Sequence, residues 1–79
     1  MVRMTSFDVA LWRVWPSLFP LWTATLQAPN AYSAIVQLMQ VHGLRSVGAA
    51  AANARDGSIR YRCFGLRGVP RGLIWMDRR

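Results

Sequence analysis

The sequence predicts a small α+β domain in which two to four short helices precede a C-terminal β-hairpin. Three observations lead to this fold class. Apolar residues recur at helical spacing through residues 1–54, prolines and a glycine divide that part into short segments, and residues 58–64 alternate apolar and charged side chains. The 79 residues allow one domain, with an apolar helical part (1–54) and an Arg-rich hairpin or extended tail (55–79).

The first helix is expected over residues 6–14. Phe7, Leu11 and Val14 share one face at helical spacing, while Asp8 in the first turn and Arg13 in the last both suit the helix dipole. This Arg-bearing, acid-poor end also has some features of a mitochondrial presequence, which would place the protein in an organelle. An ordinary N-terminal helix is the alternative, and no secretory signal peptide is expected.

Two further helices are expected at residues 18–27 and 31–42. The first carries an apolar stripe and ends where Pro29 removes a backbone donor and restricts the residue before it. The second begins after Asn30, a favourable N-cap, and stops before Gly43, a favourable helix end.

A fourth helix and a hairpin are expected in the remainder of the chain. Residues 45–54 include four consecutive alanines, the residue with the highest helix propensity. Asp56-Gly57 then indicates a turn, and residues 58–64 and 73–76 are expected to pair as the two strands of the hairpin.

The 31 residues from Val14 to Leu44 contain no charged side chain. Prolines and amide side chains interrupt this run, so it is a poor candidate for a spanning helix and is better suited to lie against a membrane or another subunit. A chain of this size buries only about 60% of its unfolded surface, so we expect packing on partner subunits to complete the fold. The predicted partner or membrane interface comprises Trp12, Trp15, Leu18, Trp22, Ile35 and Leu38.

The charged residues are ten Arg and three Asp, which give a net charge of +7. The absence of Lys is explained either by codon usage or by a need for guanidinium groups. Arginines interleaved with aromatic residues suit phosphate contacts and base stacking, although a solvated basic face has the same composition. The candidate RNA- or anion-binding residues are Arg55, Arg60, Arg62, Arg67, Arg71, Arg78 and Arg79, with Tyr61, Phe64 and Trp75 for stacking or packing.

The sequence gives little support for catalysis. General acid–base and metal chemistry draw on carboxylates and histidines, of which the chain has three Asp, one His and no Glu. Cys63 alternates with apolar residues and His42 lies on the apolar side of its helix, so both are interpreted as packing residues. We therefore expect no enzyme activity, metal, cofactor or small-molecule substrate.

Together these patterns predict a non-catalytic structural subunit of a ribonucleoprotein of the organellar-ribosome type. Its Arg-rich C-terminal part would contact RNA phosphates, and its apolar part would contact protein subunits. One alternative is an accessory subunit of a membrane-embedded, respiratory-type complex that uses Val9–Leu44 against lipid or other subunits, with its basic end at an anionic membrane surface. A membrane-active basic peptide is a third, minor possibility.

Overall fold

The computed structural model describes residues 3–68 and 74–77, and the side chains of residues 3–65. These described residues form one α-helix and a five-stranded antiparallel sheet with strand order β2-β1-β3-β4-β5. The elements in chain order are β1 (Thr5–Arg13), β2 (Phe19–Ala28), α1 (Ala31–Val41), β3 (Ser46–Ala54), β4 (Arg60–Gly68) and β5 (Ile74–Asp77).

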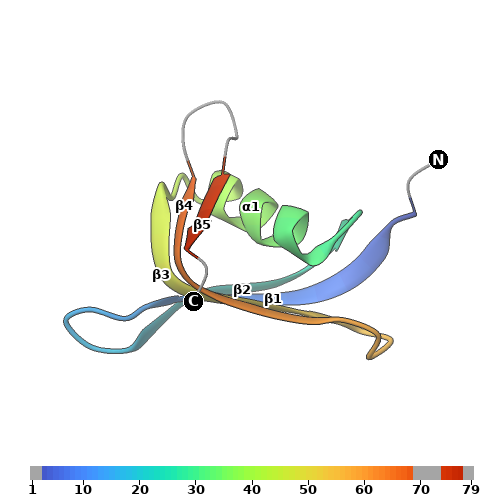
Figure 1. Cartoon of the computed structure of the whole chain (residues 1–79), viewed down its shortest axis with the longest axis horizontal. Coiled ribbons are helices and arrows are strands. Elements are labelled where there is room, and N and C mark those ends of the chain that lie inside the picture. Colours follow the sequence, from blue (N-terminus) through green and yellow to red (C-terminus); the bar gives the residue numbers. More distant parts are fainter. Residues whose placement is uncertain (1–2, 69–73, 78–79) are drawn as a thin grey trace.

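Strand β1 lies between β2 and β3 and pairs with both in antiparallel fashion. The connection from β2 to β3 therefore passes across β1, and α1 makes this crossing on one face of the sheet (Figure 1). The hairpin that joins β1 to β2 projects beyond the sheet at one end, and the turn between β3 and β4 lies at the other end (Figure 1). Among the described residues, no helix covers the other face of the sheet.

The helix predicted for residues 6–14 is wrong, because these residues form β1. Phe7, Val9 and Leu11 are all buried and alternate with the exposed Asp8 and half-buried Ala10, which is the period of a strand. Phe7 and Leu11 also lie four residues apart, and this spacing fits a helix equally well. The pairing partners on β2 and β3 decide between the two.

The helices predicted for residues 18–27 and 45–54 are wrong as well, since these segments form β2 and β3. Pro20 is tolerated in β2 because this strand lies at the edge of the sheet. In β3, the alanines have high intrinsic helix propensity, but the strand occupies an interior position between β1 and β4. Tertiary contacts therefore override local preference there.

The helix predicted for residues 31–42 is confirmed as α1. Asn30 has an extended backbone and its side-chain oxygen accepts a hydrogen bond from the backbone N–H of Ser33 at 2.8 Å. After the helix, Gly43 takes a positive φ of 66°, a conformation that favours glycine. The strands predicted at 58–64 and 73–76 correspond to β4 and β5, but β4 also pairs with β3, so they extend the sheet instead of standing apart as a hairpin.

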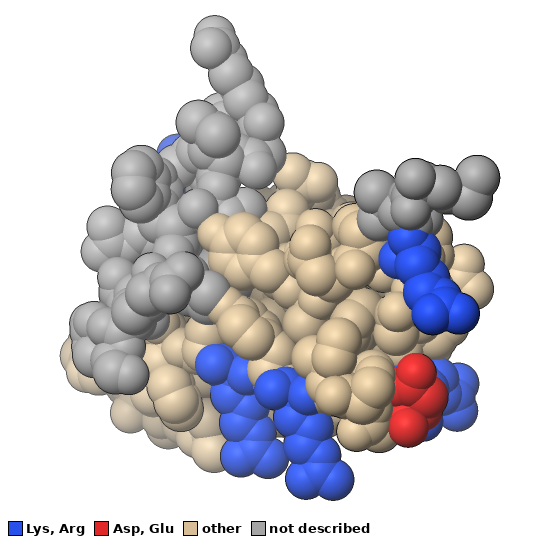
Figure 2. All heavy atoms as spheres, turned by 45° about the vertical axis from the view of Figure 1, so that its right-hand side comes forward, with Lys and Arg blue, Asp and Glu red and all other residues tan. Residues whose placement is uncertain are grey.

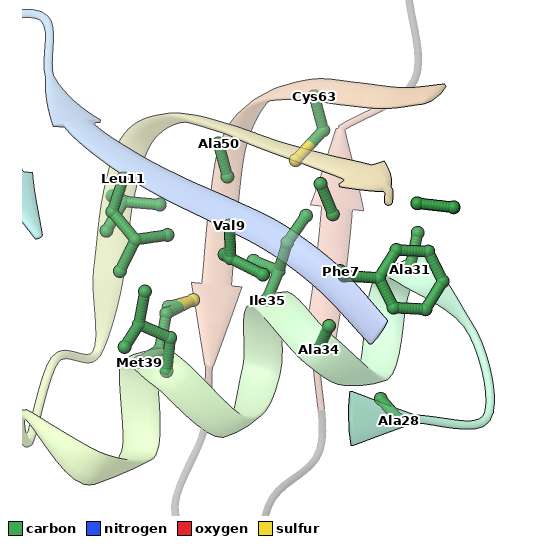
Figure 3. Close-up of a cluster of buried hydrophobic side chains, with 14 residues drawn as sticks. Phe7, Val9, Leu11, Ala28, Ala31, Ala34, Ile35, Met39, Ala50 and Cys63 are labelled. Atoms are coloured by element: carbon green, nitrogen blue, oxygen red, sulfur yellow. The ribbon is translucent and has the colours of Figure 1, made fainter. Parts of the chain in front are cut away.

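The hydrophobic core lies between α1 and the sheet face that it covers. Phe7, Val9 and Leu11 of β1 point toward Ile35 and Met39 of α1 (Figure 3). The core also receives small side chains from α1 and from strands β2, β3 and β4, which allow the two layers to approach closely. The small contributors include Ala28, Ala31, Ala34, Ala50, Ala52, Ala54 and Cys63.

Candidate functional site

Three rows of side chains cross β1, β3 and β4 on the sheet face opposite α1, because alternate residues of each strand point away from the core. The pairing register places neighbours on adjacent strands side by side in each row. From the end nearer the β1–β2 hairpin, the rows are Trp12, Ala49 and Phe64; then Thr23, Ala10, Ala51 and Arg62; then Thr25, Asp8, Asn53 and Arg60. We refer to these eleven residues as the open face.

A shallow depression of about 340 Å³ lies in the open face. Ala10 and Ala51 contribute little side-chain volume in its middle row, while the larger Trp12, Thr25 and Asn53 also line it. The size is at the lower end of the range for small-molecule and cofactor sites. A single planar group, such as a nucleobase, is of a suitable size for this depression.

Asn53, which lines the depression, has one buried side-chain atom without a partner. The side-chain oxygen Oδ1 of Asn53 accepts no hydrogen bond from any described residue. Leaving a buried acceptor unpaired costs about 1–3 kcal/mol. Because solvent does not reach this oxygen, the cost is one of folding and does not indicate a ligand.

Asp8 is an acidic group in a face that otherwise carries cations, and two neighbours offset its charge. The hydroxyl of Thr25 donates a hydrogen bond to Asp8 Oδ1 at 2.8 Å, and Arg55 Nε lies 3.9 Å from Asp8 Oδ2. Both partners of the ion pair are more than half exposed, so it contributes little to stability. Its effect is to reduce the repulsion that Asp8 would exert on an anionic ligand.

Arg60, Arg62 and Phe64 form the β4 side of the open face, and all three are exposed. Two residues along a strand correspond to roughly 7 Å, so the two guanidinium groups follow one another along the same strand face. Phe64 is 63% exposed although it is a large aromatic residue. Figure 2 shows arginine side chains projecting from the lower side of the molecule, which is the side opposite α1.

The structure brings together only part of the predicted RNA-binding set. Arg55 lies at the β3–β4 turn beside Asp8, and Tyr61 faces the core, where its ring meets Tyr32 edge-on at 6.5 Å between centroids. Tyr61 is therefore a packing residue. Arg71, Arg78 and Arg79 lie outside the described residues, and the side chains of Arg67 and Trp75 lie outside the described side chains.

The predicted partner-interface residues lie in four different surroundings. Trp15 and Leu18 are exposed at the β1–β2 hairpin. Trp12 belongs to the open face, and Trp22 stacks on His42 with 3.7 Å between ring centroids and an interplanar angle of 3°. Ile35 and Leu38 are buried in the protein's own core and leave no surface for a partner.

The described groups offer little for acid–base or metal chemistry. No cluster of three or more His, Cys, Asp or Glu side chains occurs within the described part of the chain. Burial raises the pKa of the Cys63 thiol above its ordinary value of 9.0, which disfavours the reactive thiolate. Hydrogen bonds from the hydroxyl and the backbone N–H of Ser58 lower the pKa of Asp56, whose role is to hold the exposed β3–β4 turn.

The sequence did not indicate that Asn53, Trp12, Ala10 and Ala51 belong to one site. If residues 6–13 and 46–54 are taken as strands, Asp8, Ala10 and Trp12 lie on one face of the first strand. Ala49, Ala51 and Asn53 lie on one face of the second strand. Only the pairing of β1 with β3 then joins these faces. Nothing in the local sequence encodes that pairing.

No helix in the described ranges is long and apolar enough to cross a membrane. Comparisons with protein-family models, with curated proteins and with solved structures found no match to this chain.

Proposed function

We propose that this chain is a non-catalytic structural subunit of a ribonucleoprotein and that it binds single-stranded RNA on the open face. The observation that carries the proposal is the placement of Arg60, Arg62 and the exposed Phe64 along one face of β4, beside the shallow depression. Cations that contact phosphates and aromatic side chains that stack on bases are the two components of single-strand binding.

The geometry favours a single strand over a duplex. Trp12 and Phe64 lie on either side of Ala49, two strand spacings or roughly 9.5 Å apart, so each can present a ring to an unpaired base. Bases in a double helix are stacked on one another and are not free to contact such rings. The arginines would then contact the backbone that connects the unpaired bases.

The first test measures affinity for a single-stranded oligoribonucleotide as a function of salt concentration. Each phosphate contact contributes a slope of about 0.7 in log affinity against log salt for single strands, so R60Q/R62Q is expected to lower the slope by about 1.4. R13Q/R45Q is the matched control, because it removes the same charge from exposed residues outside the open face. Equal slopes for the two double variants would contradict the proposed site, and an absence of salt-sensitive RNA binding would contradict the proposed function.

The second arm tests stacking. Phe64→Ala is expected to weaken single-strand binding by about 5- to 150-fold, since stacking on an aromatic ring is worth about 1–3 kcal/mol per base. Ile59→Ala removes another exposed apolar side chain, outside the open face, and should leave affinity unchanged. A duplex of the same sequence should bind more weakly than the single strand and respond little to Phe64→Ala.

A further inference from the structure

The tip of the β1–β2 hairpin is the most exposed apolar part of the described chain. Trp15 is 83% exposed and Leu18 is 70% exposed, and Val14 and Phe19 beside them are also exposed. We call residues 14–19 the hairpin tip. Large apolar side chains gathered in this way on a soluble surface usually mark a site of interaction.

The tip projects from the sheet, and Val14 at its base lies close against β3. It extends beyond the end of the sheet (Figure 1), so the tip can contact another surface without any movement of the strands. Val14 lies so close to Gly48 of β3 that a Cβ atom at Gly48 would come within 2.7 Å of it. Trp15 and Leu18 are thereby presented outward from a supported base.

Two cations lie at the end of the sheet from which the tip projects. The guanidinium of Arg13 lies 4.9 Å from the ring centre of Phe19, and Arg45 directly precedes β3 at the same end of the sheet, since Val14 contacts Gly48. The two acidic residues with described side chains lie elsewhere: Asp8 is in the third row of the open face, and Asp56 is in the turn at the other end. The described surface around the tip is therefore apolar in its centre and positive at its margin.

We propose that the hairpin tip inserts into the interfacial region of an anionic phospholipid bilayer. Tryptophan is favoured at the headgroup level, an apolar element can bury roughly 5–10 Å into the headgroup–acyl boundary, and each nearby arginine gains about 1 kcal/mol from anionic lipid. An apolar groove on a protein would cover Trp15 and Leu18, but it would give no reason for cations at the margin. Charge complementarity thus selects the anionic bilayer as the occupant.

This insertion does not depend on RNA binding, because the two surfaces use different residues. The open face uses Arg60, Arg62 and Phe64, whereas the tip uses Trp15 and Leu18 with Arg13 and Arg45. A chain with both surfaces could hold an RNA beside a membrane.

The test uses the full chain and phosphatidylcholine vesicles with and without phosphatidylserine. Co-sedimentation should show binding that requires phosphatidylserine, and lipids brominated near the headgroup should quench tryptophan fluorescence. Trp15→Ser/Leu18→Ser is expected to weaken vesicle binding by roughly tenfold or more, because it removes two exposed apolar side chains from the tip. The same variant should keep its circular dichroism spectrum and its RNA affinity.

Two matched controls make the outcome decisive. Val41→Ser removes a side chain that is 73% exposed at the end of α1 and should leave vesicle binding unchanged. R13Q/R45Q should lower vesicle affinity by roughly 30-fold, and R60Q/R62Q, with the same loss of charge, by much less. Absence of vesicle binding would overturn the proposal, as would equal effects of the tip variant and Val41→Ser or equal effects of the two arginine pairs.

Discussion

Gly48 shows how a single residue controls the direction of the hairpin tip. An ideal Cβ at this position would lie 2.7 Å from both the Cγ2 and the backbone nitrogen of Val14, closer than real Cβ atoms approach other atoms. The absence of a side chain on Gly48 therefore allows the end of β1 to pass over β3.

We expect Gly48→Ala to destabilise the protein by about 1–3 kcal/mol, the usual cost of overpacking. The measurement is the urea midpoint followed by circular dichroism. Adding Val14→Ala should recover only part of the loss, because the backbone nitrogen of Val14 is as close as its side chain. Full recovery would show that the backbone can move aside and that Gly48 does not fix the tip.

At the level of elements, the start of helix α1 is determined by a residue next to it in the sequence, the N-cap Asn30. The side chain of Asn30 accepts a hydrogen bond from the N–H of Ser33, one of the donors that the first turn leaves unpaired. Within the described chain no acidic residue lies in the first turn of α1, so the cap acts without help from a favourable charge.

Asn30→Ala should therefore cost about 0.5–2 kcal/mol of stability, whereas Asn30→Asp should retain most of it. Gln40→Ala serves as the control, since Gln40 is exposed on the same helix and alanine favours helix formation. A loss for Gln40→Ala equal to that for Asn30→Ala in thermal unfolding would contradict the capping role.

The difference between α1 and β3 explains how much of the fold could be predicted from the sequence. Asn30 and Gly43 mark the ends of α1 by chemistry that acts within a few residues. In β3, the alanines gain their conformation from β1 and β4, which are distant in sequence. Residues 6–14, 18–27 and 45–54 were assigned to helices because local propensity contains no information about such pairing.

The same distinction applies to the open face. The alternation of Arg60 and Arg62 with the buried Cys63 could be read within one strand, and the structure agrees with it. Asn53 and Trp12 join this surface only through the register of three strands. The same alternation places Tyr61 on the side of Cys63, so its packing against the core also follows from the pattern of one strand.

For the whole molecule, the small core sets a narrow margin of stability. Ile35 is completely buried between the helix and the sheet, and replacing it with alanine costs about 2–5 kcal/mol. A lone core in a chain of this size rarely supplies more than about 3–5 kcal/mol in total. A single truncation is thus comparable with the entire stability.

Ile35→Ala is accordingly expected to unfold most of the protein at room temperature, with loss of both RNA and vesicle binding. Val41→Ala removes an exposed side chain from the same helix and should leave the circular dichroism spectrum unchanged. If Ile35→Ala stayed folded and lost only its association with other proteins, Ile35 would be an interface residue, as the sequence had suggested.

Because β1 lies between β2 and β3, its two edges are completed at very different times while the chain is being synthesised. The edge that meets β2 is paired as soon as the hairpin has emerged, whereas Phe7 to Trp12 must wait for Ala49 to Ala54. Until then the nascent chain presents an unpaired edge and the apolar surface of Phe7, Val9 and Leu11, a combination that invites aggregation. We therefore expect that a chaperone that binds the nascent chain at the exit of the ribosome would raise the yield of folded protein.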